Sequence, residues 1–198
     1  MEMSLLLSMC GFALAMSISP GPVNLVALGS GAQHGFRASL RHVVGATLGF
    51  ILLLLLMGLG LGALLSRWPL VVGALHWGGI LFLGYMAWQL VRSGGELEGE
   101  SGQRPAFWYG ALMQWLNPKA WLAASMGMGA YGGAGGWGQM VVFTALYLVI
   151  CLGSIACWAY VGSCLQQALL SPRRLRWFNR VMALLLLLSA GYLLFAEG

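Results

Sequence analysis

Six long apolar runs, separated by short connectors, constrain this chain more than any other feature of its sequence. A helix rises 1.5 Å per residue, so about 20 apolar residues cross the ~30 Å hydrocarbon core of a bilayer. Because 60% of the residues are hydrophobic and only 8% are charged, one soluble domain of 198 residues could not bury these side chains. The sequence therefore predicts an all-α membrane protein with six transmembrane helices, at about 4–33, 43–65, 69–91, 106–131, 138–164 and 178–196.

Two of the runs contain residues that cannot continue a regular helix. Pro20, Gly21 and Pro22 interrupt the first run, and Pro118 interrupts the fourth. Proline has no N–H to donate, and glycine loses more conformational freedom than other residues in a helix. Inside a bilayer, a broken backbone is stable only where protein covers it or where it lines a wet cavity. We therefore expect helices 1 and 4 to be broken, and paired breaks of this kind indicate a transporter's binding site.

Arginine is distributed unevenly between the connectors. The first, third and fifth connectors hold two, two and four arginines, whereas the second holds only Arg67 and the fourth holds none. Positive residues near span ends stay in the cytoplasm, so the odd-numbered connectors should be cytoplasmic and both termini should lie outside. Three spans in each half reverse the orientation of the second half. We expect a single transmembrane domain, 1–198, made of two inverted three-helix repeats, 1–92 and 106–198, joined by a cytoplasmic linker loop at 93–105.

Lys119, next to Pro118, is the only lysine in the chain and lies within the fourth apolar run. Burying its ammonium group costs at least about 2.5–3.5 kcal/mol on insertion scales, so the group needs a partner or a wet cavity. No Asp or Glu lies within a predicted span. The partner is therefore a backbone carbonyl freed at a break or an external anion such as a substrate carboxylate, and we favour the carboxylate. A lysine that snorkels to the interface is the weaker alternative, because Lys119 lies centrally in its run.

The half-helix that follows the first break offers a second group for an anion. Pro22 suits the first turn of a helix, where free N–H groups and the helix dipole attract negative charge. Asn24 lies in that turn, and Gln114 and Asn117 lie three residues apart near the second break. Their amides can orient a substrate, with hydrogen bonding between helices as the alternative for each. The predicted substrate-binding residues are Pro20, Gly21, Pro22, Asn24, Gln114, Asn117, Pro118 and Lys119.

Other reactive or small residues are assigned structural roles. Histidine titrates near neutral pH, but we expect His42 at the cytoplasmic interface and His76 in a structural hydrogen bond. Ser30 and His34 are four residues apart, but a hydrolase also needs an orienting group and oxyanion donors, and nothing in the sequence indicates them. The four cysteines lack the spacing of metal ligands, so we expect packing roles and no metal or other cofactor. Helix packing is also the expected role of Gly45, Gly49, Gly58, Gly60, Gly62, Gly127 and Gly129.

Three stretches of the sequence carry a family resemblance. They are SPGPVN at 19–24 with HGFRASL at 34–40, QWLNPKAW at 114–121, and GYMAW at 84–88 followed by Arg92. These stretches resemble the lysine exporter (LysE/RhtB) family of bacterial amino-acid exporters, and the similarity covers nearly the whole chain in length, order and spacing. It implies a small exporter of amino acids in the inner membrane, driven by the proton gradient. Arg41 stands where many relatives carry proline, and no functional conclusion follows from it.

The lack of an intramembrane carboxylate also limits the substrate. A lysine or arginine side chain would want a buried anion, so we expect a neutral amino acid of the homoserine, threonine or cysteine kind. The expected mechanism is proton-coupled alternating access, with the amino acid, protons and the lipid bilayer as partners. Nucleic acid is excluded because the basic residues form no continuous face. The alternatives are an exporter of basic amino acids, a metal carrier, a membrane-embedded enzyme or a scaffold subunit, and the sequence leaves open whether the chain forms a homo-oligomer.

Overall fold

Helices make up all the regular structure in residues 2–92, 107–132 and 136–195, which are the residues that the computed structural model describes. The all-α prediction is therefore confirmed for this part of the chain, whereas the predicted linker loop, 93–105, lies outside it. The elements in chain order are α1 (Met3–Ile18), α2 (Pro22–His34), α3 (Phe36–Leu56), the π-helical turn η1 (Met57–Leu61), α4 (Gly62–Leu65), α5 (Pro69–Arg92), α6 (Phe107–Trp115), α7 (Pro118–Tyr131), α8 (Gly136–Leu165), the 3-10 turn η2 (Ala168–Leu170) and α9 (Pro172–Phe195).

Both predicted helix breaks are present. The first separates α1 from α2 with a bend of 60°, and the second separates α6 from α7. A proline begins each second half-helix, Pro22 in α2 and Pro118 in α7. Proline is favoured there because the first turn of a helix leaves its N–H groups unpaired in any case.

Three described helices are long and apolar enough to cross a membrane, namely Phe36–Leu65, Pro69–Arg92 and Gly136–Leu165. The bent pair α1 and α2 is a fourth candidate if it forms one span. Large apolar side chains also face outward, including Leu70, Leu81 and Trp137, which are 90%, 72% and 70% exposed. Such surfaces are typical of contact with lipid or with another protein.

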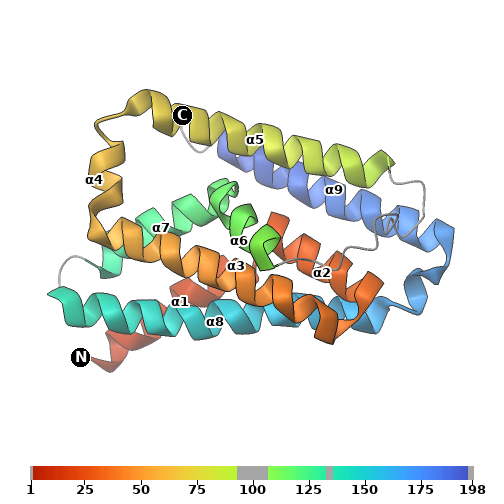
Figure 1. The fold of residues 1–198 in the computed structure, drawn as a ribbon, viewed down its shortest axis with the longest axis horizontal. Helices are drawn as coiled ribbons and strands as arrows, with labels where there is room; N and C mark the ends of the chain where they lie inside the picture. Colours follow the sequence, from red (N-terminus) through yellow and green to blue (C-terminus); the bar gives the residue numbers. More distant parts are fainter. Residues whose placement is uncertain (1, 93–106, 133–135, 196–198) are drawn as a thin grey trace.

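The long helices form two layers around the shorter half-helices (Figure 1). α5 and α9 pack side by side in one layer, and α3 packs along α8 in the other. The start of α1, the α4–α5 turn and the start of α8 lie at one end of the molecule, and the α2–α3 turn and the α8–α9 connection lie at the opposite end. One apolar core lies among α1, α3, α7 and α8, and a second joins α2 to α5 and α9.

Glycines allow close approach between α2 and α8. A Cβ on Gly31 would overlap the carbonyl of Ala159, and a Cβ on Gly162 would overlap that of Leu28. Small residues of this kind let helices meet backbone to backbone in lipid. α3 and α6 meet in the same way, at Gly45, Gly49 and Gly110.

The second predicted span, 43–65, differs from the structure in its start and in its regularity. The first connector was expected to extend to residue 42, but α3 begins at Phe36, because Gly35 alone reverses the chain with a φ of +79°. The second run is not one regular helix, because Gly60 has a φ of +101° inside the π-helical turn that follows α3. That backbone conformation favours glycine, so the role of Gly60 is to turn the helix rather than to pack against a neighbour.

Candidate functional site

Lys119 connects the two helix breaks. Its Nζ donates hydrogen bonds of 2.7 Å to the carbonyl oxygen and to Oγ of Ser19, and it lies 3.4 Å from the carbonyl oxygen of Pro20. A lysine ammonium has three donors, and all three acceptors here belong to the break between α1 and α2. The two partners predicted for Lys119 are backbone carbonyl oxygens freed at a break and an external anion. The structure shows the carbonyl oxygens.

Asn24 holds the first break together. Its Nδ2 donates to the carbonyl oxygens of Ser17 and Ser19, at 2.8 Å and 2.9 Å. These carbonyls lie at the end of α1, where no further helical turn supplies N–H donors. The buried Asn24 amide therefore satisfies both of them, as expected of an amide that bonds between helices.

The two half-helices that follow the breaks begin differently. Asn117 caps α7, because its Oδ1 accepts from the N–H of Lys119 at 3.2 Å, and its Nδ2 lies 3.5 Å from Oε1 of Gln114. α2 is preceded by Gly21, and no side chain caps it. The N–H groups in the first turn of α2 are thus left without a side-chain acceptor.

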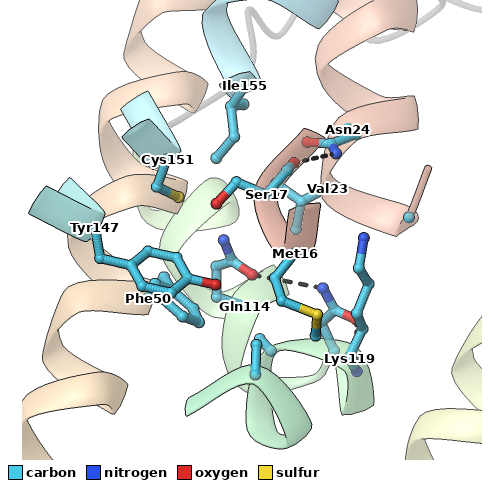
Figure 2. A pocket seen from close by; sticks show the side chains of 14 residues that line it. Met16, Ser17, Val23, Asn24, Phe50, Gln114, Lys119, Tyr147, Cys151 and Ile155 are labelled. Atoms are coloured by element: carbon cyan, nitrogen blue, oxygen red, sulfur yellow. Dashed lines mark hydrogen bonds between the residues drawn. The ribbon is translucent and has the colours of Figure 1, made fainter. Parts of the chain in front are cut away.

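A cavity of about 40 Å³ lies where the two breaks meet (Figure 2). One water needs about 10–15 Å³ on this measure, so the cavity has room for a few waters. Five of the predicted site residues line it, whereas Pro20, Pro22 and Pro118 shape the backbone without lining it. The lining residues are Met16, Ser17, Gly21, Val23, Asn24, Phe50, Gln114, Asn117, Lys119, Ala120, Ala123, Tyr147, Cys151 and Ile155.

The residues that form the wall of the cavity opposite Lys119 are not among the predicted site residues. Tyr147 and Cys151 of α8 and Phe50 of α3 form this wall, and Ser17 projects toward it from the last turn of α1 (Figure 2). Cys151 was expected only to pack, and it lies buried in the wall. Lys119 is the one charged side chain among the lining residues, so the wall around Tyr147 carries no formal charge.

The prediction for His42 is wrong. The residue was expected at the cytoplasmic interface, but its side chain is completely buried where α3 meets α6. Its ring centroid lies 6.1 Å from that of Tyr109, and neither ring nitrogen has a hydrogen-bond partner in the part of the chain described. Because α3 begins at Phe36, His42 lies well inside the helix instead of in a connector.

The arrangement of Ser30 and His34 does not form a catalytic dyad. The hydroxyl of Ser30 shares a 2.6 Å hydrogen bond with that of Ser39, and the buried Nδ1 of His34 has no partner among the described residues. A base that activates serine must be within hydrogen-bond reach of its hydroxyl. Within the same residues, no group of three or more His, Cys, Asp or Glu is arranged to hold a metal ion.

Comparison with known proteins decides the family. A family model described as LysE type translocator matches residues 14–197. The chain belongs to the LysE type translocator family. This confirms the resemblance drawn from the two break motifs.

Relatives of this LysE translocator include proteins named cysteine/O-acetylserine efflux protein. Those of Escherichia coli (strain K12) and Shigella sonnei (strain Ss046) are each 30% identical over 194 residues, which is 96% of this chain and 97% of the relative. That of Shigella flexneri is 30% identical over 183 residues, covering 90% and 92% of the two chains. No solved structure matches the chain significantly.

Proposed function

We propose that this LysE translocator exports neutral amino acids across the bacterial inner membrane in exchange for protons. The observation that carries the proposal is the position of Lys119, which reaches from one helix break to the other beside a small cavity. Family membership and the efflux function named for the relatives support it. Cysteine and O-acetylserine, which those names mention, both have uncharged side chains.

In this proposal the substrate carboxylate binds to Lys119. It replaces the oxygens of Ser19 as acceptor, and a carboxylate makes stronger, charge-assisted hydrogen bonds to an ammonium group. The uncapped first turn of α2 adds N–H donors and the positive end of a helix dipole. Asn24, Gln114 and Asn117 line the same cavity, where their amides can orient the substrate.

The charge of the cavity favours a substrate with a neutral side chain. Among the residues that the structure describes, no acidic side chain lines it, and Lys119 is positive. A lysine or arginine substrate would place a second cation there without a counter-charge, which is costly in surroundings of low dielectric. An exporter of basic amino acids is thus the weaker alternative.

For transport, we propose six spans in two inverted three-helix repeats, 1–92 and 106–198, with rocking of one repeat against the other. The matching breaks before Pro22 and Pro118, one in each half, support this arrangement. The cavity holds only a few waters, so its walls must separate before an amino acid can enter. The distribution of arginines favours an orientation with both termini outside.

The proposal is tested with Lys119→Met, which keeps the length of the side chain and removes its charge. We expect the half-saturating concentration of a neutral amino acid to rise by about 10- to 100-fold, as for a lost hydrogen bond to a charged group. Efflux is measured from inside-loaded proteoliposomes with a panel of neutral and basic amino acids, with and without a proton gradient.

Arg67→Met is the matched control, because it removes a positive charge from an exposed residue in the α4–α5 turn. It should transport like the wild type. Near-normal transport by a correctly inserted Lys119→Met variant would rule out the proposed role of the lysine. Export of lysine or arginine alone would leave the exporter intact but contradict the neutral substrate.

A further inference from the structure

The hydroxyl of Ser17 has an unusual environment. The residue is 9% exposed, and its Oγ faces the polar groups of Tyr147 and Cys151 but makes no hydrogen bond of good length and angle among the described residues. Hydroxyls inside other helices of this protein bond to the carbonyl four residues earlier, as Thr47, Thr144 and Ser125 do at 2.8 Å. A buried hydroxyl without a partner is rare in native structures and needs an explanation.

Ser17 lies on the lining of the cavity, not in a packed helix interface. Figure 2 shows its hydroxyl directed into the space bordered by Tyr147 and Cys151, away from Lys119. Tyr147 and Cys151 are four residues apart, so they share one face of α8. Phe50 and Ile155 complete this end of the cavity with apolar surface.

The cavity therefore has two chemically different ends. One end carries Lys119 and the uncapped start of α2, both of which attract negative charge. The other end is uncharged and combines apolar surface with the hydroxyls of Ser17 and Tyr147 and the thiol of Cys151. An amino acid has the matching form, with a carboxylate at one end and a side chain at the other.

We propose that Ser17, Tyr147 and Cys151 form the side-chain subsite, and that Ser17 selects short, uncharged side chains that can hydrogen-bond. This inference rests on the proposed function. The side chains concerned carry a hydroxyl, a thiol or an ester oxygen close to Cα. A purely apolar side chain of the same size leaves the Ser17 hydroxyl unpaired, and a site built to hydrogen-bond discriminates against such an analogue.

Three substrates of nearly equal size test the subsite. Serine, cysteine and 2-aminobutyrate differ mainly in a hydroxyl, thiol or methyl group on Cβ. We expect the wild type to export serine or cysteine in preference to 2-aminobutyrate, by about 2- to 10-fold for one hydrogen bond. Ser17→Ala should lose that preference and continue to export 2-aminobutyrate.

Ser125→Ala is the matched control, because Ser125 is exposed on α7 and its hydroxyl bonds within its own helix. This variant should keep the wild-type preference. Ser17→Ala should retain the thermal midpoint of the wild type or raise it, because it removes an unpaired buried hydroxyl. A shift in selectivity without loss of stability is not expected of a merely structural residue.

Substrate-induced thermal stabilisation in detergent gives a second measurement that does not depend on transport. Serine or cysteine should stabilise the wild type more than 2-aminobutyrate does, and Ser17→Ala should abolish the difference. If Ser17→Ala keeps the preference, or if the wild type shows none, the subsite is overturned and the exporter remains. If the wild type neither binds nor exports any neutral amino acid, the proposed function itself fails.

Discussion

At the scale of single residues, Asn24 contributes most to the geometry of the first break. Its one amide group donates to two carbonyl oxygens that α1 leaves unpaired, those of Ser17 and Ser19. In apolar surroundings such carbonyls have no water to replace a lost donor. The residue predicted to orient substrate therefore also holds the broken backbone in place.

Asn24→Ala should destabilise the protein by about 1–3 kcal/mol, because the buried carbonyl oxygen of Ser17 loses its side-chain donor, whereas that of Ser19 keeps Lys119. The measurement is the thermal midpoint of the detergent-solubilised protein. Gln89→Ala is the control, since Gln89 is exposed and its amide donates only to the hydroxyl of Tyr85. Equal midpoints for the two variants would mean that Asn24 does not support the break.

The site residues that could be predicted from the sequence are those with strong effects on the local backbone or charge balance. Proline, glycine and a lone lysine in apolar runs interrupt a helix or demand a partner whatever the tertiary structure. Tyr147 and Cys151 have no such local effect, because their run is apolar on every face. Their position in the cavity depends on how α8 rotates against α1 and α3, which the sequence alone does not specify.

At the scale of helices, glycines at contact points determine which pairs meet closely. α2 and α8 touch through Gly31 and Gly162, where any Cβ would overlap a backbone carbonyl of the other helix. Backbone cannot give way as a flexible side chain can, so a larger residue forces the two helices apart.

The apolar runs and their breaks were predictable, but the bend at Gly60 was not, because its neighbours Gly58 and Gly62 form the same sequence pattern without a positive φ.

Gly31→Ala should lower stability by about 1–3 kcal/mol, as expected of an overpacked contact. Gly29→Ala in the same helix is the control, because a Cβ there meets nothing within 4 Å. Alanine favours a helix over glycine by about 1 kcal/mol, so the control should be neutral or stabilising. Thermal midpoints and the yield of folded protein distinguish the two, and a stabilised Gly31→Ala variant would contradict the close contact.

At the scale of the whole molecule, two turns that the structure describes lie at opposite ends. The α4–α5 turn lies at the end where α1 starts, and the α2–α3 turn lies at the opposite end (Figure 1). In the orientation proposed from the arginine distribution, the second of these ends faces the cytoplasm. Arg67 and Arg37, both exposed, mark the two ends in the sequence.

Single cysteines at these positions test the orientation. In a variant that keeps only the buried Cys151, Arg67→Cys should react with a membrane-impermeant maleimide in intact cells. Arg37→Cys should react only after the cells are permeabilised. The reverse pattern would invert the orientation, and labelling of both in intact cells would show that the chain between them does not cross the membrane.

The contact between Lys119 and Ser19 has a consequence for the step after substrate has left. An ammonium group stripped of acceptors in apolar surroundings costs at least about 2.5–3.5 kcal/mol on insertion scales. In the proposed function, a departing carboxylate leaves the lysine to the two oxygens of Ser19, with which the structure shows it hydrogen-bonded. Because the protein supplies these oxygens, the return step of the proposed exchange needs only the proton and no second amino acid, so the carrier can achieve net efflux.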